Sequence, residues 1–275
     1  GLESNLKDNI LSHDGDLLEK YKDKFYLLSS PFLNTEYLGI HIPRAIEVKS
    51  PLMFKNFRKA LNHSFDRKKM IKYLRNDLVI PGNKGIVHPV LSNCYDIRGF
   101  HYSPDSVRSL LKDVPDFKEK IIINTTQDYL DICEFIRHSA EDFGIKIDIE
   151  ISSPSVHREL VSSSQASCFR ASWIADYPDP ENYLSLFCSD NKSPKGPNYT
   201  HFSNQLFDSL YQESLFEINY IKRCELFRKM EGILIEESVL VPLYYDYSIR
   251  VVSNKISGMS INSMNRLSLK KVKKN

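Results

Sequence analysis

The chain has 275 residues, of which 41% are hydrophobic, enough to bury a core in one large domain or two small ones. Its 37 Lys and Arg residues nearly balance its 35 Asp and Glu residues, and the formal net charge of +2 excludes the basic excess of a nucleic-acid-binding protein. No apolar run reaches the roughly 18 residues of a membrane span, and the first residues have neither the basic nor the apolar region of a signal peptide.

The first part of the sequence combines extended and helical patterns. Residues 1–25 are polar and helix-like, and the extended stretches 25–28 and 37–40 follow. From 54 to 65 the apolar residues recur every three or four positions, which predicts an amphipathic helix. Asp66 is placed to cap the next helix.

The clearest unit lies in the middle of the chain. A short helix is expected to begin at Ser103-Pro104, and residues 120–124 then form an apolar strand. Thr125 or Thr126 can cap the helix that follows, and Gly144 stands where a left-handed helix end belongs. Isoleucines alternate with charged residues over 145–151, as in a strand with one buried face. Strand, helix and strand together predict a βαβ unit with parallel strands.

Helices and strands continue to alternate in the last part. The expected elements are a helix over 156–162, a strand over 168–173, helices over 203–215 and 221–234, and a strand over 239–245. Pro242 inside the last strand indicates an edge or a bulge. The lysine run at 270–274 is interpreted as a solvated chain end rather than a site for an anionic partner. We therefore expect one α/β unit with its strands in one sheet and helices on its faces.

The cysteines give no metal-binding pattern. None of the five is spaced as C-x-x-C, and no histidine lies near enough to complete a zinc finger. Cys133 and Cys224 fall on apolar helix faces and are expected to be buried thiols. Cys168 and Cys188 could pair in an oxidising compartment, but spacing alone does not establish a bridge.

Motifs of the common enzyme classes are missing. The sequence contains no G-x-S-x-G elbow, no H-E-x-x-H, no phosphate-binding loop and no dinucleotide fingerprint. Its eight histidines are scattered singly, and each is interpreted as a surface or satisfied core residue. We expect no catalytic residue, no cofactor and no metal.

Residues 169–180 are the most informative segment. A strand runs into a loop stiffened by two prolines, with the chain's single Trp, Trp173, near the strand's end. Ligands of open α/β sheets bind at the carboxyl ends of strands. Asp176, beside aromatic rings and partly withdrawn from water, suits a cationic group such as an ammonium. The alternative is that Asp176 and Asp179 cap a helix that starts near Glu181.

The stretch from Trp173 to Pro180 resembles the W-x-A-D-Y-x-[DE]-P motif of the family 5 solute-binding proteins, the oligopeptide and dipeptide binders that serve ABC transporters. Similar segments occur in the family's order at 58–67, 102–111, 143–149, 204–210 and 242–245. Val107 departs from the pattern, because the family usually has Ala there. The resemblance covers about residues 54 to 260.

Membership in this family implies a fold and a place in the cell. The fold would be one lobe of a type II periplasmic-binding protein, α/β with a mixed, mostly parallel sheet flanked by helices. Residues 1–275 would form the second, ligand-gripping lobe, with 1–25 and 255–275 leading from and back to a first lobe. The sequence would then be a piece of a longer protein that works outside the cytoplasmic membrane, in the periplasm or as a lipoprotein.

The resemblance also assigns residues to the ligand site. Asp176 stands where peptide-binding members pair the ligand's α-ammonium, and Arg170 aligns with an arginine near the ligand's carboxylate. Trp173 and Tyr177 would line the cleft beside them. Asp179, with the proline after it, is expected to shape the loop. The implied partners are a small peptide and the permease subunits of an ABC transporter.

Two other interpretations stay open. The same family also carries non-peptide ligands, such as a nickel or other metal chelate, a sugar or a cell-wall peptide. An acid at position 176 favours peptides, because the family's nickel-binding branch is not expected to keep it. A third interpretation is a hydrolase with Asp176 and Asp179 as its carboxylate pair. Ligand length, the partner permease and a lipid anchor are not determined by the sequence.

Overall fold

The computed structural model describes residues 9–12, 14–115 and 119–275. Its main sheet contains the strands β1 (Phe25–Ile40), β2 (Ile80–Pro81), β3 (Ile121–Thr125), β4 (Ile147–Ile151), β5 (Cys168–Ile174) and β6 (Leu240–Ser253). These six strands lie in the order β2-β6-β1-β5-β3-β4. The helices are α2 (Glu19–Lys22), α3 (Ile42–Glu47), α4 (Lys55–His63), α5 (Arg67–Arg75), α6 (Pro104–Lys112), α7 (Leu130–Glu141), α8 (Pro154–Ser162), α9 (Glu181–Leu184), α10 (Gln205–Phe216) and α11 (Tyr220–Glu237).

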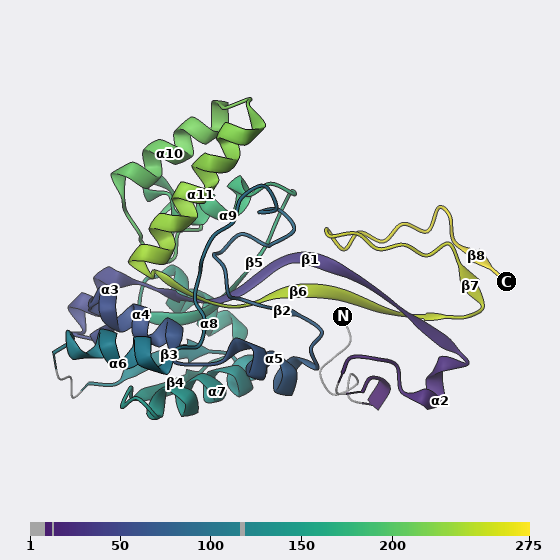
Figure 1. Cartoon of the computed structure of the whole chain (residues 1–275), viewed down its shortest axis with the longest axis horizontal. Coiled ribbons are helices and arrows are strands. Elements are labelled where there is room, and N and C mark those ends of the chain that lie inside the picture. The colour runs from purple at the N-terminus through teal and green to yellow at the C-terminus, as the bar shows by residue number, and fades with distance from the viewer. Residues whose placement is uncertain (1–8, 13, 116–118) are drawn as a thin grey trace.

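The predicted α/β class is confirmed, with a mixed sheet and flanking helices (Figure 1). The predicted βαβ unit is also present, because β3 and β4 are parallel and α7 connects them. The pairings divide the sheet in two. Parallel ladders join only β3 to β4 and to β5, whereas β1 pairs antiparallel with β5 and β6, and β2 with β6. Two of the five ladders of this sheet are therefore parallel.

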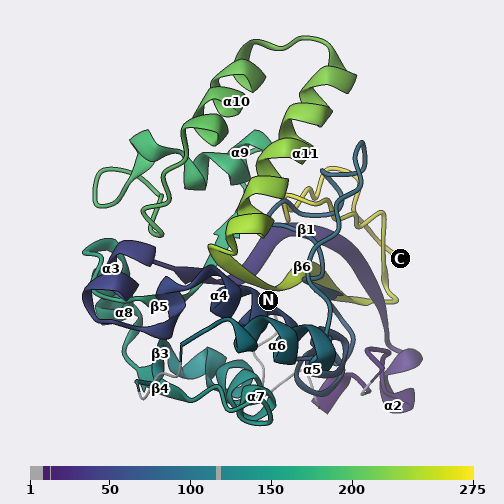
Figure 2. The same cartoon turned by 60° about the vertical axis from the view of Figure 1, so that its left-hand side comes forward.

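The two largest hydrophobic clusters cover the two faces of the sheet. The larger one packs α4, α5, α6 and α7 against strand residues that include Leu38, Ile123 and Val241. The second packs α9, α10 and α11 against residues that include Leu33 and Leu240. The α10–α11 pair stands out from the body as a helical hairpin (Figure 2).

Most of the expected helix ends are found. Asp66 accepts hydrogen bonds from Lys68 N at 2.9 Å and Lys69 N at 3.2 Å, as a cap should. Ser103 caps α6, and Gly144 takes the left-handed conformation with φ of +76°. The expected threonine cap of α7 was wrong. A 3-10 turn over 127–129 precedes this helix, so the chain enters it without a side-chain cap.

Strands β1 and β6 form a ribbon longer than the sequence indicated. The two extended stretches expected in β1 are joined into one strand of 16 residues, and β6 continues past residue 245 to Ser253. Beyond the other strands, Phe25 to Pro31 pair only with β6, from Ser253 to Tyr247. Pro242 sits at a register shift opposite Tyr37, which confirms the bulge, although β6 lies inside the sheet rather than at its edge.

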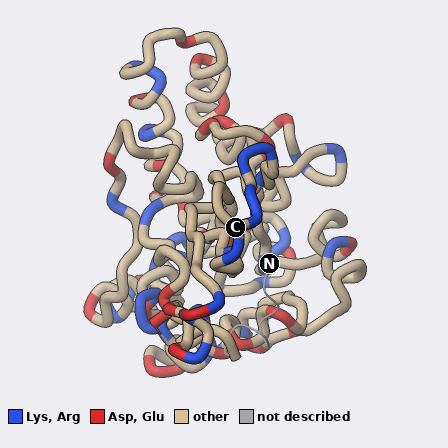
Figure 3. The backbone as a smooth tube through the Cα atoms, turned by 90° about the vertical axis from the view of Figure 1, so that its right-hand side faces the viewer, with Lys and Arg blue, Asp and Glu red and all other residues tan. Residues whose placement is uncertain are grey.

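The first described residues lie beside the end of α5, where Asn76 Nδ2 donates to Ser12 O at 3.1 Å, whereas the C-terminus lies at the far end of this ribbon. Helix α2 and the small β7 (Ile256–Ser257) and β8 (Lys273–Lys274) pair are found there (Figure 1). The lysines of the tail are exposed, as expected for a solvated end, and Figure 3 shows them gathered near the C-terminus. The N-terminal residues 1–8 of the expected helix lie outside the described residues. In the described part of the chain, no helix is both long and apolar enough to cross a membrane.

A disulfide fastens the long segment between β2 and α6 to α11. Cys94 and Cys224 are bonded across 130 residues of sequence, with their Cα atoms 6.0 Å apart. The expectation that Cys224 is a free buried thiol was therefore wrong. Cys168 and Cys188 do not pair, and with Cys133 they are buried free thiols. Spacing could not reveal the bridge, because it depends on a loop folding back over a distant helix.

A buried carboxyl holds the same segment. Glu231 of α11 is 1% exposed and accepts hydrogen bonds from Val87 N and Tyr95 Oη, both at 2.9 Å. Gly85 allows this approach, because a Cβ there would collide with the carboxyl group. Burial raises the pKa of Glu231 to about 7. The protonated form of this side chain therefore stabilises the folded state more than the ionised form does.

The disulfide predicts a thiol count and a stability change. Titration of the unfolded, unreduced protein should find three thiols, and five after reduction. Replacing both Cys94 and Cys224 by Ala should lower the free energy of unfolding by about 2–4 kcal/mol in chemical denaturation. Reductant should leave this double variant unchanged. Five thiols before reduction would contradict the bridge.

Glu231 predicts a pH dependence of stability. Its pKa is raised in the folded state from 4.5, so its contribution is fully present below about pH 4.5 and is lost as the pH rises through about 7. Between pH 5 and 8 the free energy of unfolding should therefore fall by up to about 3 kcal/mol. The variant Glu231→Gln should show a smaller fall, whereas Glu225→Gln, exposed on the same helix, should follow wild type. Identical profiles for all three proteins would show that Glu231 is not a buried acid.

Candidate ligand site at the carboxyl end of strand β5

Strand β5 extends past the end of its parallel neighbour β3. The two strands pair only at Cys168 and Phe169, and the rest of β5 lies along β1 alone. Residues 170–174 and the loop 175–180 therefore project beyond the parallel strands. This is the edge at which open α/β sheets bind ligands.

Asp176 presents a free carboxylate on this loop. Its side chain is exposed, and within the described part of the chain the carboxylate has no hydrogen-bond or ion-pair partner. Its backbone N donates to Asn182 Oδ1 at 3.1 Å, and the same oxygen accepts from Trp173 Nε1 at 2.9 Å. Asn182 is only 5% exposed. One buried amide thus fixes Trp173 and Asp176 relative to each other, a role that the sequence did not reveal.

Asp179, in contrast, is fully engaged. Its carboxylate accepts from Glu181 N at 2.9 Å at the start of α9, and it forms a two-pronged ion pair with Arg223 at 2.7 and 3.1 Å. The helix-capping interpretation therefore holds for Asp179, which also shapes the loop as expected. The carboxylate of Asp176 makes no such bond. A pair of free carboxylates, as a glycoside hydrolase would need, is not formed.

Tyr177 is half-exposed and turns back toward α9. Its hydroxyl donates to Glu181, whose other carboxylate oxygen accepts from the hydroxyl of Tyr211 on α10. Burial and the bond to Glu181 raise the pKa of Tyr177. The ring is thus held next to Asp176 by the helices behind the loop.

Arg170 lies on the same strand but is committed to a buried ion pair. Its Nη2 is 2.7 Å from Glu36 Oε2, and its guanidinium lies 3.3 Å from the centre of the Tyr129 ring. Burial raises the pKa of Glu36, while the charge of Arg170 acts to lower it. Asn34 donates to both Glu36 Oε1 at 3.0 Å and Asp246 Oδ2 at 2.8 Å, which completes the network.

Sequence reasoning missed these partners of Arg170. Glu36, Asn34 and Asp246 stand on β1 and β6, far along the chain from residues 169–180. One signal was available, because Glu36 is the one charged residue in the strand β1. Burial of such a residue requires a cationic partner, but the sequence does not say which one.

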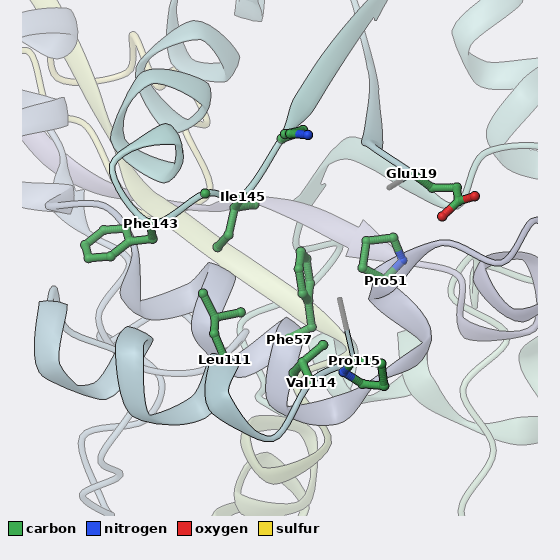
Figure 4. Close-up of a pocket in the computed structure, with 10 residues that line it drawn as sticks. Pro51, Phe57, Leu111, Val114, Pro115, Glu119, Phe143 and Ile145 are labelled. Atoms are coloured by element: carbon green, nitrogen blue, oxygen red, sulfur yellow. The ribbon is translucent and has the colours of Figure 1, made fainter. Parts of the chain in front are cut away.

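The predicted site residues do not coincide with a metal-binding cluster or with the pocket at α4 and α6. Among the described residues, no group of three or more His, Cys, Asp or Glu is placed to hold a metal ion. A pocket between α4, α6 and the residues just before β4 is lined by residues that include Phe57, Leu111 and Phe143 (Figure 4). Pro115 and Glu119 in its wall flank residues outside the described part, and none of the predicted site residues lines it.

Comparison with known proteins gives a consistent family. Residues 8–195 match the family model for bacterial extracellular solute-binding proteins, family 5 (middle region). The oligopeptide-binding protein OppA of Bacillus subtilis is 27% identical over 225 residues, which covers 76% of this chain and 40% of that protein. The glutathione-binding protein GsiB of Escherichia coli K12 is 24% identical over 258 residues, covering 89% and 48%. Heme-binding protein A of Haemophilus influenzae is 22% identical over 248 residues, covering 87% and 44%.

Solved structures agree on the fold. A periplasmic oligopeptide-binding protein from Borrelia burgdorferi has a TM-score of 0.79 at 22% identity, covering 99% of this chain and 52% of its own. The binding protein DppA of Helicobacter pylori, in complex with the peptide STSA, has a TM-score of 0.77 at 21% identity, covering 100% and 52%. The fold is that of the type II periplasmic binding proteins. The chain spans about half the length of these relatives.

The buried pair predicts a specific pattern of stability changes. Arg170→Met leaves the Glu36 carboxylate in the interior without its cation and should lower the free energy of unfolding by about 3–5 kcal/mol. The double variant Glu36→Gln/Arg170→Met removes both charges and should recover most of the loss. Arg108→Met, which breaks an exposed pair on α6, should change stability by less than about 1 kcal/mol. If Arg170→Met were as stable as this control, the pair would not be the buried contact described above.

Proposed function

The chain belongs to the family 5 bacterial extracellular solute-binding proteins, and from that membership we propose that it forms the ligand-gripping lobe of a peptide-binding component of an ABC importer. The observation that carries this proposal is the unpaired carboxylate of Asp176 at the carboxyl end of β5, held in place through Asn182. It pairs with the α-ammonium of a bound peptide. The protein performs no chemistry on its ligand.

The chemistry of the site suits an ammonium group. In the lobe alone the carboxylate faces water, where an ion pair contributes only about 0–1 kcal/mol. Once a second lobe covers the ligand, the same pair acts in a less polar medium and becomes stronger. Trp173 and Tyr177 provide the apolar walls, and neither has to move to do so, because Asn182 and Glu181 already hold them.

Arg170 takes a supporting position in this proposal. We place it near the carboxylate of the ligand, where the family resemblance puts an arginine. Its Nη2 is already bound to Glu36, so part of its charge is neutralised within the lobe. Its contribution to affinity is therefore smaller than that of Asp176.

The ribbon of β1 and β6 supports a two-lobed arrangement. Both strands leave the sheet together, and at their far end lie α2, from the segment 1–25, and β7 and β8, from the segment 255–275, as Figure 1 shows. We propose that these segments lead to a first lobe, and that the two lobes close on the ligand about this connection. The match to about half the length of the relatives agrees with this arrangement.

The proposed location is outside the cytoplasmic membrane, in the periplasm or on a lipid anchor. The Cys94–Cys224 disulfide supports it, since such bonds persist in oxidising compartments. The permease subunits of an ABC transporter are the proposed protein partners.

A non-peptide ligand is the alternative within the family. One relative is named for heme binding, and a metal chelate or a sugar would fit the same fold. None of these ligands offers an ammonium to Asp176. The peptide proposal is favoured because it uses the one exposed carboxylate of the loop that has no partner in the described structure.

The proposal is tested by calorimetric titration of the two-lobed protein with a tripeptide. Acetylation of the peptide's amino group removes the positive charge, and Asp176→Ala removes the carboxylate. Each change alone should weaken binding at least tenfold, or about 1.4 kcal/mol. Acetylation should have no further effect in Asp176→Ala, because the two changes remove the same ion pair.

Asp190→Ala serves as the matched control, since Asp190 is also exposed and follows α9. It should bind the free peptide as wild type does. The 275-residue chain alone should bind the peptide only weakly, because most of the ligand stays in water. Equal affinity for free and acetylated peptide, or no binding of any peptide, would overturn the proposal.

A further inference from the structure

The turn that joins α10 to α11 concentrates exposed apolar side chains. Residues 215–221, called the apolar tip below, include five large apolar residues that are all exposed: Leu215, Phe216, Ile218, Tyr220 and Ile221. Ile218 is 99% exposed and Phe216 80%. Elsewhere in the described chain, exposed large apolar residues occur one or two at a time along the sequence. Single residues of this kind are ordinary, whereas a concentration of them marks a surface that binds something.

The apolar tip is a protrusion. The helices α10 and α11 stand out from the body as a hairpin, and the turn between them lies at its outer end (Figure 2). Sites for small molecules are concave and close around their ligand. A convex tip has to enter its partner instead.

The size of the apolar tip favours a lipid surface over another protein. A specific protein interface uses about 20–30 residues from each partner, but the tip has only seven, and the exposed charges of Glu213, Lys222 and Glu225 flank it. A second copy of the chain would therefore gain too little contact for a stable dimer. A bilayer needs no matching surface, because apolar side chains simply enter the boundary between head groups and acyl chains. Tyr220 suits this layer, in which tyrosine is enriched.

Polar groups of the turn are bonded within the turn itself. Glu217 N donates to Glu213 O at 3.1 Å, and Asn219 N donates to Glu217 Oε1 at 2.6 Å. Asn219 Oδ1 caps α11 by accepting from Lys222 N at 3.1 Å. A backbone that leaves water for an apolar layer must find its hydrogen bonds internally. These contacts lower the cost of moving the tip into lipid.

The charges around the apolar tip exclude attraction to anionic lipid. Between 213 and 225 the acids are Glu213, Glu217 and Glu225, and the bases are Lys222 and Arg223. Arg223 is already paired with Asp179, so one unpaired base stands against three acids. Contact with a bilayer would therefore depend on burial of apolar side chains, and it suits lipid without net charge.

We propose that the apolar tip inserts into the interfacial layer of a bilayer rich in zwitterionic lipid and so holds this end of the protein against a membrane. The inference goes beyond the proposed function, because it concerns neither the peptide ligand nor Asp176. It assigns to the α10–α11 hairpin a partner of its own, the lipid surface.

The test is co-sedimentation of the two-lobed protein, free of any lipid anchor, with phosphatidylcholine vesicles. Wild type should partition onto the vesicles. Phe216→Ser/Ile218→Ser should partition at least tenfold less, because burial of even one large apolar side chain is worth about tenfold or more. Added phosphatidylglycerol should not strengthen binding, and added salt should not weaken it.

The matched control is Ile46→Ser/Tyr73→Ser, which removes two exposed apolar side chains from α3 and α5. It should bind vesicles as wild type does. Thermal unfolding at the wild-type temperature checks that both double variants are folded. In a second measurement, the emission of Ile218→Trp should shift to shorter wavelength when vesicles are added, whereas that of Tyr73→Trp should not.

Three results would overturn the inference. The first is that wild type does not bind vesicles, and the second is that Phe216→Ser/Ile218→Ser binds them equally well. The third is a dimer in sedimentation velocity that this double variant dissociates, which would give the apolar tip to a second copy of the chain. None of these results bears on Asp176, whose role is decided separately by the tripeptide titrations.

Discussion

The antiparallel pairing of β1 with β6 is the constraint on which the rest of the fold depends. It runs from Phe25 opposite Ser253 to Gly39 opposite Leu240, and it joins two segments that are more than 200 residues apart in the sequence. On its other edge β1 sets the register of β5, with Thr35 opposite Trp173. A slip of one residue would turn every side chain to the other face of the sheet. Glu36 would then no longer contact Arg170, and the loop after β5 would no longer be held in its position.

The same logic applies to the loops around the candidate site. Neither the loop after β5 nor the segment before α6 contains regular structure that could hold it in place. Side chains on α9 and α11 fix both of them: Asn182 and Arg223 bind the loop after β5, and Cys224 and Glu231 bind the segment before α6. Helix α11 thereby acts as a common support for both loops. The position of α11 against the sheet therefore determines where the loop with Asp176 lies.

The sequence predicted features that depend on residues close together in the chain, and it did not predict contacts between distant residues. Asp66, Ser103 and Gly144 were identified correctly, because helix ends are decided by residues within a few positions of each other. The βαβ unit followed from local periodicity in the same way. The predicted threonine cap of α7 was wrong, because a 3-10 turn lies between Thr126 and the first residue of the helix. The sequence pattern does not distinguish these two ways of starting a helix.

Long-range partners could not be read from the sequence. The motif from Trp173 to Pro180 located the loop and singled out Asp176, but it did not reveal Asn182 as the residue that orients both. The ion pair of Arg170 with Glu36 and the bridge of Cys94 to Cys224 join residues more than 120 positions apart. From the sequence alone, any acid of the chain could have been the partner of Arg170, and any cysteine the partner of Cys94. The division of the sheet into parallel and antiparallel halves likewise depends on where β1 inserts, which no local pattern records.

The central claim is that a rigid lobe presents one unpaired carboxylate to a peptide's amino end. The most direct measurement is a crystal structure of the two-lobed protein with a bound tripeptide. We predict closed lobes, with the ammonium nitrogen about 3 Å from a carboxylate oxygen of Asp176 and with Trp173 still bonded to Asn182. A peptide bound in the closed cleft with its ammonium on another group, and Asp176 turned to solvent or to a lysine of the protein, would contradict the account.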